Sequence, residues 1–376
     1  MRLLIYVALM SLATHALANN IIEGNQGSKI KGSVVERFQN PWAMSFISPE
    51  RLLVTTKSGD LWLVHTSGEK SLVTGVPKVF YGGQGGLGDV VPHPNFKQNK
   101  FIYISYISSD TAGDTRYAAV VRAQLNIKHS PKLENITTVW NQTPARPGKG
   151  HFSHKITLGQ QGSKHDGKIF ITSGDRQEQT PAQHWDKALG KIIRLNDDGS
   201  VPGDNPFQDK GELAKTFWSI GHRNSLGIAF NHKNELWAHE MGPKHGDELN
   251  LILPGANYGW PIVSEGNHYS GAVIPTHDTR PEFQKPKLFW VPTVDPSSLF
   301  FYQGDEFSDW NGDAFLGGLK GRALVRIEFK NDLPVEAERF SWSQRVRDVE
   351  LGSDGAIWAL EDGRSGRLIK FIKAQK

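Results

Sequence analysis

The stretch Lys168-Ile169-Phe170-Ile171-Thr172-Ser173 is a short, largely apolar run, and five other runs along the chain resemble it. The other five span residues 51–56, 100–105, 235–240, 313–318 and 356–361. Each run has the length and composition of a buried β-strand, and turn-forming residues such as Gly, Asp, Asn and Pro separate the runs. No segment after residue 19 shows sustained 3.6-residue periodicity over helical length. The sequence therefore predicts an all-β protein.

Several of these runs are followed by a glycine-containing turn and a second apolar run, as at residues 59–64, 189–194 and 366–371. Two short strands joined by a tight turn form half of a propeller blade. The six runs recur at intervals of about 40 to 80 residues, the usual blade period or longer where loops are inserted. A pair of β-sandwiches is the alternative, but six imperfect repeats favour closure into a ring. We therefore expect one domain over residues 19–376, a six-bladed β-propeller of four-stranded antiparallel blades.

The composition excludes several classes of protein. The 376 residues include 43 basic and 39 acidic side chains, a net charge of +4, with no long basic block. Nucleic acid is therefore not an expected partner. The chain contains no Cys, which excludes disulfide scaffolds, thiolate metal sites and cysteine nucleophiles.

The N-terminus has the three parts of a secretory signal peptide. A charged start, Met1-Arg2, precedes an apolar run from Leu3 to Leu12, and Ala16-Leu17-Ala18 supplies the small-x-small cleavage pattern. The run is too short to span a bilayer, so no membrane span is expected. A buried N-terminal strand or helix is the alternative. We expect residues 1–18 to be removed and the mature protein to be soluble and periplasmic, or secreted.

Five stretches carry a specific resemblance. They are Gly82–Leu87, Gly150–Phe152, Gly221–Gly227, residues 240–250 with Glu-Met-Gly-Pro and Gly-Asp-Glu-Leu-Asn, and Gln344–Asp348. In this order they resemble the soluble pyrroloquinoline-quinone (PQQ) dehydrogenases of aldose sugars, the glucose/sorbosone dehydrogenase family. The resemblance implies a six-bladed propeller with PQQ in a polar cleft at one end of the central channel. It implies a periplasmic enzyme that oxidises aldoses at C1 to lactones and passes the electrons to an unknown soluble or membrane-associated acceptor.

The resemblance also implies catalytic roles. Oxidation of the C1 hydroxyl needs a base for the proton, and a neutral imidazole suits this task near physiological pH. His151 matches the family's general base. Arg223 matches the arginine beside the quinone oxygen that receives the hydride, and Asn224 matches a hydrogen-bonding partner of the cofactor. Calcium and a guanidinium together would stabilise the developing negative charge.

Metal ligands follow from the same resemblance. Calcium prefers hard oxygen ligands, including backbone carbonyls. Gly242 and Pro243 match the pair whose main-chain oxygens hold the cofactor's calcium. Glu248, through its carboxylate, and Tyr258, through its main-chain oxygen, match a structural calcium site. Residues 264–271 do not reproduce the further ligands of the glucose-oxidising members, so we expect one structural calcium rather than two.

PQQ carries three carboxylates and no covalent tether, so its site must supply fixed positive charge. Lys320, Arg345 and Arg347 match the family's cationic contacts. Arg345 and Arg347 are two residues apart, so on a strand both would lie on one face. Gln84, in a Gly-rich loop, matches a cofactor contact near the substrate, and Thr293 matches a residue that lines the cleft.

Departures from the family pattern affect the expected substrate. Lys155 stands where arginine is usual, and Val291 and Asp295 differ from what a strict glucose oxidiser would carry. We therefore expect broad aldose specificity. Two alternatives stay open, a calcium-dependent lactonase on a similar propeller and a propeller that only binds carbohydrate. The lactonase hypothesis leaves the three cationic cofactor contacts unexplained.

Overall fold

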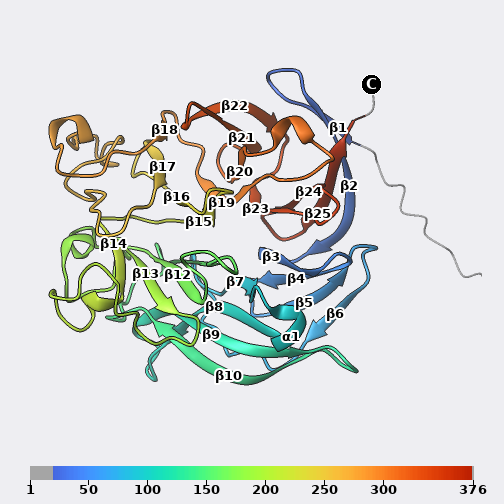
Figure 1. The fold of residues 1–376 in the computed structure, drawn as a ribbon, viewed down its shortest axis with the longest axis horizontal. Helices are drawn as coiled ribbons and strands as arrows, with labels where there is room; N and C mark the ends of the chain where they lie inside the picture. The colour runs from blue at the N-terminus through green and yellow to red at the C-terminus, as the bar shows by residue number, and fades with distance from the viewer. Residues whose placement is uncertain (1–19, 375–376) are drawn as a thin grey trace, which may run out of the picture.

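The computed structural model describes residues 20–374, and these form six β-sheets arranged around a central axis (Figure 1). The predicted six-bladed β-propeller is confirmed. The predicted signal peptide, residues 1–18, lies outside the described residues. Among the described residues, no helix has both the length and the apolar character needed to cross a membrane.

Each blade is an antiparallel sheet, and we number the blades in chain order. Blade 1 contains β3 (Pro41–Ser48), β4 (Arg51–Thr56), β5 (Leu61–His65) and β6 (Lys70–Val73). Blade 2 contains β7 (Leu87–Pro92), β8 (Phe101–Ser109), β9 (Arg116–Asn126) and β10 (Lys132–Asn141). Blade 3 contains β11 (Ser153–Leu158), β12 (Lys168–Ser173), β13 (Lys191–Asn196) and β14 (Phe217–Ile220).

The second half of the ring repeats this order. Blade 4 contains β15 (Gly227–Phe230), β16 (Leu236–Glu240), β17 (Asp247–Leu251) and β18 (Leu288–Trp290). Blade 5 contains β19 (Pro296–Phe301), β20 (Ala314–Gly318), β21 (Ala323–Lys330) and β22 (Leu333–Ser341). Blade 6 contains β23 (Val346–Leu351), β24 (Ile357–Glu361), β25 (Gly366–Lys373), β2 (Lys29–Phe38) and β1 (Asn20–Glu23).

Helical structure is confined to short connections. These are α1 (Phe96–Asn99) and the 3-10 turns η1 (Thr180–Gln183), η2 (Ala214–Thr216), η3 (His277–Thr279) and η4 (Ser308–Trp310). The long connections, such as the one between β17 and β18, belong to the loops that stretch the repeat beyond the usual blade period.

The six similar runs of the sequence are the second strands of the six blades, namely β4, β8, β12, β16, β20 and β24. Their side chains are buried on both faces, because each blade packs against a neighbour on either side. Leu53, Ile104 and Ile171, one from each of the first three blades, are fully buried. Burial on both faces explains why the runs are almost continuously apolar instead of alternating.

The ring closes where the two ends of the chain meet in blade 6. Strand β2 pairs with β25 from Ile30 opposite Lys373 to Phe38 opposite Gly366. Strand β1 then pairs with β2, so blade 6 has five strands where four were predicted. Joining early and late strands in one sheet removes two open edges from the ring.

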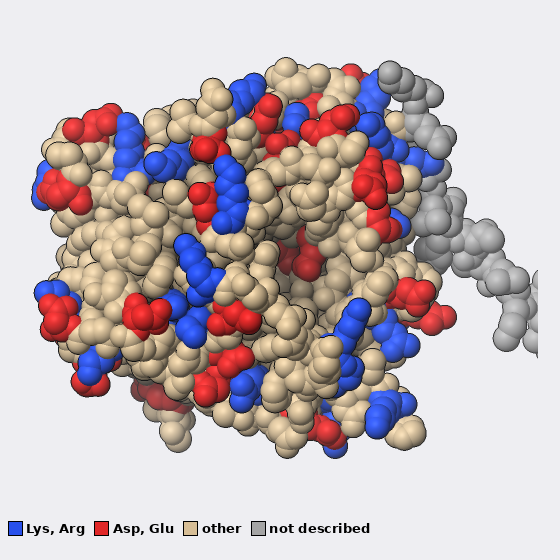
Figure 2. All heavy atoms as spheres, in the orientation of Figure 1, with Lys and Arg blue, Asp and Glu red and all other residues tan. Residues whose placement is uncertain are grey.

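A buried ion cluster links the first strands of three blades near the axis. Lys155 Nζ in β11 lies 2.8 Å from Asp89 Oδ1 in β7 and 3.5 Å from Asp348 Oδ1 in β23. All three side chains are at most 10% exposed. The backbone N–H of Met44 in β3 donates to the other oxygen of Asp348 at 2.7 Å. We call Lys155, Asp89 and Asp348 the axial cluster. The centre of the ring is hollowed, and acidic side chains are visible inside it (Figure 2).

We expect Lys155→Met to lower the free energy of unfolding by about 3–5 kcal/mol, because it leaves two carboxylates buried without their cation. Chemical denaturation at pH 7 measures this change. Glu350→Gln is the matched control, because burial and the neighbouring Asp348 raise the pKa of Glu350 to about 8 and so favour its uncharged form at pH 7. The control should unfold within about 1 kcal/mol of the parent. Equal unfolding midpoints for Lys155→Met and the parent would refute the role of the cluster.

Candidate active site

A cleft of about 190 Å³ lies at one end of the channel, and residues from all six blades or their connections line it. The lining residues are Trp42, Lys57, Gln84, Phe152, Ser153, His154, Leu226, Met241, Asp295, Leu319, Arg345 and Arg347. Lys57, Met241 and Leu319 each follow directly after the second strand of a blade. The repeat itself therefore brings these positions to the same end of the ring.

His151 precedes β11 and is held by a buried carboxylate. Its Nδ1 lies 2.7 Å from Asp175 Oδ1, and the two side chains are 10% and 1% exposed. Asp175 also accepts hydrogen bonds from the Trp260 indole N–H at 2.8 Å and from the Gln177 backbone N–H at 2.8 Å. Because the carboxylate only accepts, Nδ1 carries the proton and Nε2 is left with its lone pair.

The backbone around His151 adopts left-handed conformations that residues other than glycine rarely take. His151, Ser153 and His154 have φ values of 46°, 58° and 62°. Such strain persists where the surroundings over-determine it, and it concentrates at functional sites. The backbone of Gly174, which follows β12, packs directly against the His151 carbonyl. Only glycine fits there, because a Cβ would lie 2.0 Å from the carbonyl oxygen. Packing thus fixes the loop that carries the imidazole.

The environment favours the neutral form of His151. Burial lowers the pKa of the imidazole, and the nearby charge of Arg223 lowers it further, while the hydrogen bond to Asp175 acts in the opposite direction. No hydrogen bond within the described residues engages Nε2. The site therefore presents an oriented imidazole that can accept a proton at Nε2.

The two other polar residues predicted near the base lie beside it. Gln84 accepts a hydrogen bond from the His151 backbone N–H at 2.7 Å through its side-chain oxygen. Asn224 is buried, and its side-chain oxygen accepts a hydrogen bond from Ser153 Oγ at 3.1 Å. The structure therefore brings Gln84, His151 and Asn224 into one hydrogen-bonded neighbourhood.

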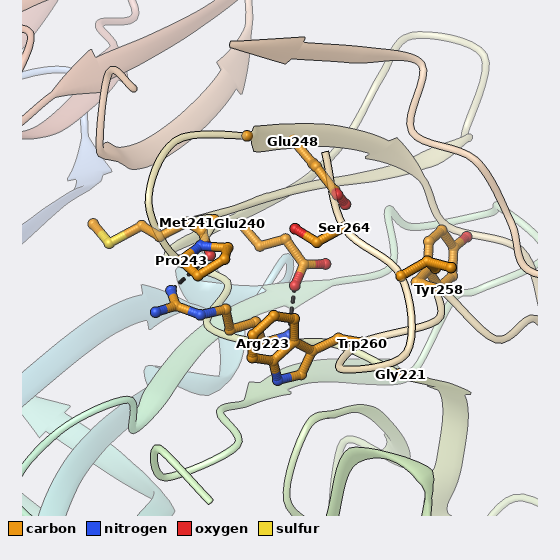
Figure 3. A pocket seen from close by; sticks show the side chains of 12 residues that line it. Gly221, Arg223, Glu240, Met241, Pro243, Glu248, Tyr258, Trp260 and Ser264 are labelled. Atoms are coloured by element: carbon orange, nitrogen blue, oxygen red, sulfur yellow. Dashed lines mark hydrogen bonds between the residues drawn. The ribbon is translucent and has the colours of Figure 1, made fainter. Parts of the chain in front are cut away.

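Arg223 is held between two elements of blade 4. Its backbone N–H donates to Glu240 at 2.6 Å, and its guanidinium donates to the Met241 carbonyl at 2.9 Å (Figure 3). The guanidinium lies 5.3 Å from the centre of the Trp260 ring, the same indole that donates to Asp175. Its Nε is buried and has no hydrogen-bond partner in the described part of the chain. Arg223 is thus a fixed, incompletely satisfied donor near the base.

All four predicted metal ligands line one small pocket next to Arg223 (Figure 3). Gly242, Pro243, Glu248 and Tyr258 surround a volume of about 10 Å³, the room that a single water molecule needs. Burial raises the pKa of Glu248, and the neighbouring carboxylate of Glu240 raises it further. Two buried carboxylates close together, with carbonyl oxygens around them, form a hard-oxygen donor set that fits one calcium ion.

Side chains alone do not form a metal site in the described residues, where no group of three or more His, Asp or Glu is arranged to hold an ion. Carbonyl oxygens would have to supply the remaining ligands. The Tyr258 carbonyl is oriented by His277, whose Nε2 lies 3.1 Å away and whose Nδ1 lies 3.0 Å from Glu265. A carbonyl oxygen has two lone pairs, so this contact leaves one for a cation.

The basic residues predicted to bind the cofactor divide into two groups by position. Arg345 and Arg347 line the cleft, and both donate to Asp362, at 2.8 Å and 3.0 Å. Val346 between them is fully buried, in agreement with the predicted strand geometry. Lys320 is exposed and does not line the cleft, although its neighbour Leu319 does.

Thr293 lies outside the lining of the cleft as well. Its hydroxyl donates to Asp247, and Asp247 also accepts the backbone N–H groups of Val294 and Asp295. The structure therefore gives the Thr293 hydroxyl a role in the turn that carries Asp295 to the cleft.

Among the charged residues that line or support the cleft, Lys57, Asp175 and Asp362 were not predicted from the sequence. A signal for them was present. Lys57 and Asp362 directly follow the similar runs at 51–56 and 356–361. Asp175 is the second residue after the run at 168–173. Since several residues after these runs line or support the cleft, the repeat alignment could have identified them.

Comparison with known proteins agrees with this geometry. The family model described as glucose/sorbosone dehydrogenase matches residues 38–370. The aldose sugar dehydrogenase YliI of Escherichia coli (strain K12) is 34% identical over 348 residues, which cover 89% of this chain and 90% of YliI. The apo crystal structure of the soluble aldose sugar dehydrogenase from Escherichia coli has a TM-score of 0.86 at 32% identity and covers 92% of this chain and 100% of that one.

A further solved relative carries a cofactor. The PQQ-bound aldose sugar dehydrogenase of Streptomyces coelicolor has a TM-score of 0.75 at 25% identity, and the match covers 92% of this chain and 98% of that one. The resemblance carried by the five sequence stretches is thereby confirmed, and the chain belongs to the glucose/sorbosone dehydrogenase family.

Proposed function

We propose that this chain is a PQQ- and calcium-dependent aldose dehydrogenase that oxidises the C1 hydroxyl of aldoses to lactones. The observation that carries the proposal is the His151–Asp175 pair, an oriented imidazole beside a cleft with two arginines. The name of the Escherichia relative and the PQQ bound to the Streptomyces relative support the substrate class and the cofactor.

The cleft fits an anionic, untethered cofactor. Lys57, Arg345 and Arg347 line it, and Asp295 is the one carboxylate among its lining residues. Arginine and lysine side chains hold carboxylates by charge-assisted hydrogen bonds. Gln84 presents an amide nitrogen at the same cleft, because its oxygen is used by the His151 backbone. Lys320 and Thr293 would act from the rim of the cleft rather than from its wall.

His151 would take the proton of the C1 hydroxyl at Nε2. Asp175 holds the ring through Nδ1 and stabilises the imidazolium that forms, as in other base–carboxylate pairs. Trp260 and Gln177 fix Asp175 in turn, so the base is oriented through two layers of hydrogen bonds. When bound, PQQ would supply the acceptor for the C1 hydride, and calcium would supply fixed positive charge beside it.

Arg223 would stabilise negative charge that develops on the acceptor side of the reaction. Its guanidinium is positioned by Met241 and Trp260, so little reorganisation is needed. Glu248 and Tyr258 would hold a single structural calcium in the small pocket. Gly242 and Pro243 directly follow Met241, which lines both the pocket and the cleft, so their carbonyl oxygens would hold the cofactor's calcium on the side of the cleft. Lys155 has no direct part in this chemistry.

The proposal includes export. We propose that residues 1–18 are a cleaved signal peptide, that the mature chain from residue 19 is one catalytic domain, and that it acts in the periplasm or outside the cell. The electrons would pass to a soluble or membrane-associated acceptor. Two alternatives remain, a calcium-dependent lactonase and a carbohydrate-binding propeller. Neither of them explains why three cationic side chains line a cleft that adjoins an oriented base.

The deciding experiment is dye-linked oxidation of a panel of aldoses by the purified mature protein, with and without added PQQ and calcium. We expect activity with several aldoses when both are present and none when either is omitted. Lactone hydrolysis without PQQ would favour the lactonase, and sugar binding without turnover would favour the binding protein.

We expect His151→Gln to lower kcat by about 10²- to 10⁴-fold, the usual contribution of a general base. His184→Gln is the control, because this histidine is exposed and its side chain contacts Lys187 instead of the residues around the base, so turnover should stay parental. Steady-state kinetics of the PQQ-loaded variants measures the effect. A decrease of less than about threefold would show that another group accepts the proton.

Asp175→Asn tests the orientation of the base. One amide oxygen cannot replace both carboxylate oxygens, which accept from His151 and Trp260, so we expect kcat to fall at least about tenfold.

The lowered pKa of His151 predicts that activity in the parent is lost on acidification only below the ordinary imidazole value of about 6.5. Because Asp175 raises this pKa, its removal should shift the acidic limb of kcat/KM further down. A shift to higher pH would contradict the assignment. Asp186→Asn, at an exposed site, is the control.

Glu248→Gln tests the structural calcium. Because burial and Glu240 already favour protonated Glu248, the variant without calcium should melt at the same temperature as the parent or slightly above. Calcium should raise the melting temperature of the parent by preferential binding to the folded state, but it should raise that of the variant much less. Thermal scans with and without calcium measure the difference, and Glu212→Gln is an exposed control. An equal calcium response in variant and parent would contradict this site.

A further inference from the structure

Lys57 lines the cleft from a turn, and both its backbone N–H and its carbonyl are hydrogen-bonded. It directly follows β4, and its backbone N–H donates to the Asn40 carbonyl at 2.9 Å. Its own carbonyl accepts from the Leu87 N–H at 3.3 Å, and a Cβ on Gly86 would lie 2.2 Å from that oxygen. The lysine side chain therefore enters the cleft from a rigid position.

The ammonium of Lys57 is not compensated in the way that the neighbouring guanidinium groups are. Arg345 and Arg347 both form ion pairs with Asp362. Lys57 Nζ instead donates to the neutral carbonyl of Gly83 at 2.9 Å. Among residues 20–374, no carboxylate oxygen lies within 4.0 Å of this nitrogen. Lys57 thus contributes a positive charge that has no ion-pair partner among residues 20–374.

The three cations also crowd one another. Burial lowers the pKa of Lys57, and the charges of Arg347 and Arg345 lower it further, against the attraction of Asp362. Asp362 offsets part of this repulsion, and the remaining excess of positive charge raises the free energy of the empty cleft. A ligand with several carboxylates would remove this repulsion, whereas a neutral sugar would not.

We propose that Lys57 binds a carboxylate of the anionic cofactor, next to the charge supplied by Arg345 and Arg347. This inference rests on the proposed function. The contact also reaches the base, because Lys57 Nζ holds the Gly83 carbonyl and the next residue, Gln84, accepts the His151 N–H. Occupancy of the cofactor site would thereby stiffen the loop that supports the catalytic histidine.

The test is direct titration of the mature protein, free of cofactor, with PQQ in the presence of calcium. Absorbance of PQQ and the shift of the melting temperature report binding without turnover. We expect Lys57→Met to weaken PQQ binding about 10- to 100-fold, since a charge-assisted hydrogen bond is lost. Lys57→Arg should stay within about threefold of the parent. Lys149→Met is the matched control, because Lys149 is exposed on the adjoining loop and does not line the cleft.

The outcomes separate this inference from the function on which it rests. If the parent protein does not bind PQQ, both fall. If the parent binds PQQ and Lys57→Met binds it equally well while remaining folded, only the role of Lys57 is refuted. A variant with parental PQQ affinity but a raised KM for aldose would assign Lys57 to the sugar instead, and it would likewise overturn the proposal.

Discussion

The axial cluster is the constraint on which the rest of the ring depends. A propeller has no single core, because each blade packs on its two neighbours, and its first strands must converge around a narrow axis. Lys155 meets Asp89 and Asp348 there and ties blade 3 to blades 2 and 6. Such a buried pair adds little net stability, but any other arrangement of the blades leaves a charge unpaired. We infer that the cluster acts chiefly by favouring this arrangement of the blades over others.

Strand β11 connects the axial cluster to the proposed catalytic base. Lys155 in β11 lies four residues after His151, and His154 between them stacks on Trp42 at 4.8 Å between ring centres. Strained backbone at His151 and His154 is maintained because this strand is anchored at one end by the axial cluster and at the other by Asp175. The position of the base is thus a consequence of how the ring is closed, and it does not depend on a flexible loop.

The sequence supports prediction of the fold better than prediction of the site. Each second strand is buried on both faces, so its apolar run is visible without knowledge of its partners, and six repeats predict six blades. The fifth strand of blade 6 is not visible in this way, because β1 is short and pairs at an edge. His151, Arg223 and the metal-ligand residues were predicted from family resemblance. The positions of Asp175, Lys57 and Asp362 could be found from the repeated runs that precede them, but their roles depend on His151, Arg345 and Arg347, which are brought near only by the fold.

Positive side chains gather in the cleft and acidic side chains gather in the small pocket, so the two places suit an anion and a cation respectively. One wall of the cleft gathers Lys57, Arg345 and Arg347, with Asp362 behind the two arginines. The neighbouring small pocket gathers Glu240 and Glu248, and Arg223 lies at its border. Asp362 offsets part of the positive charge, and the raised pKa of Glu248 reduces the negative charge of the pocket. An anion in the cleft and a cation in the pocket would each bring the opposite charge. Met241 lines both the cleft and the pocket, so ligands of opposite charge would lie next to each other.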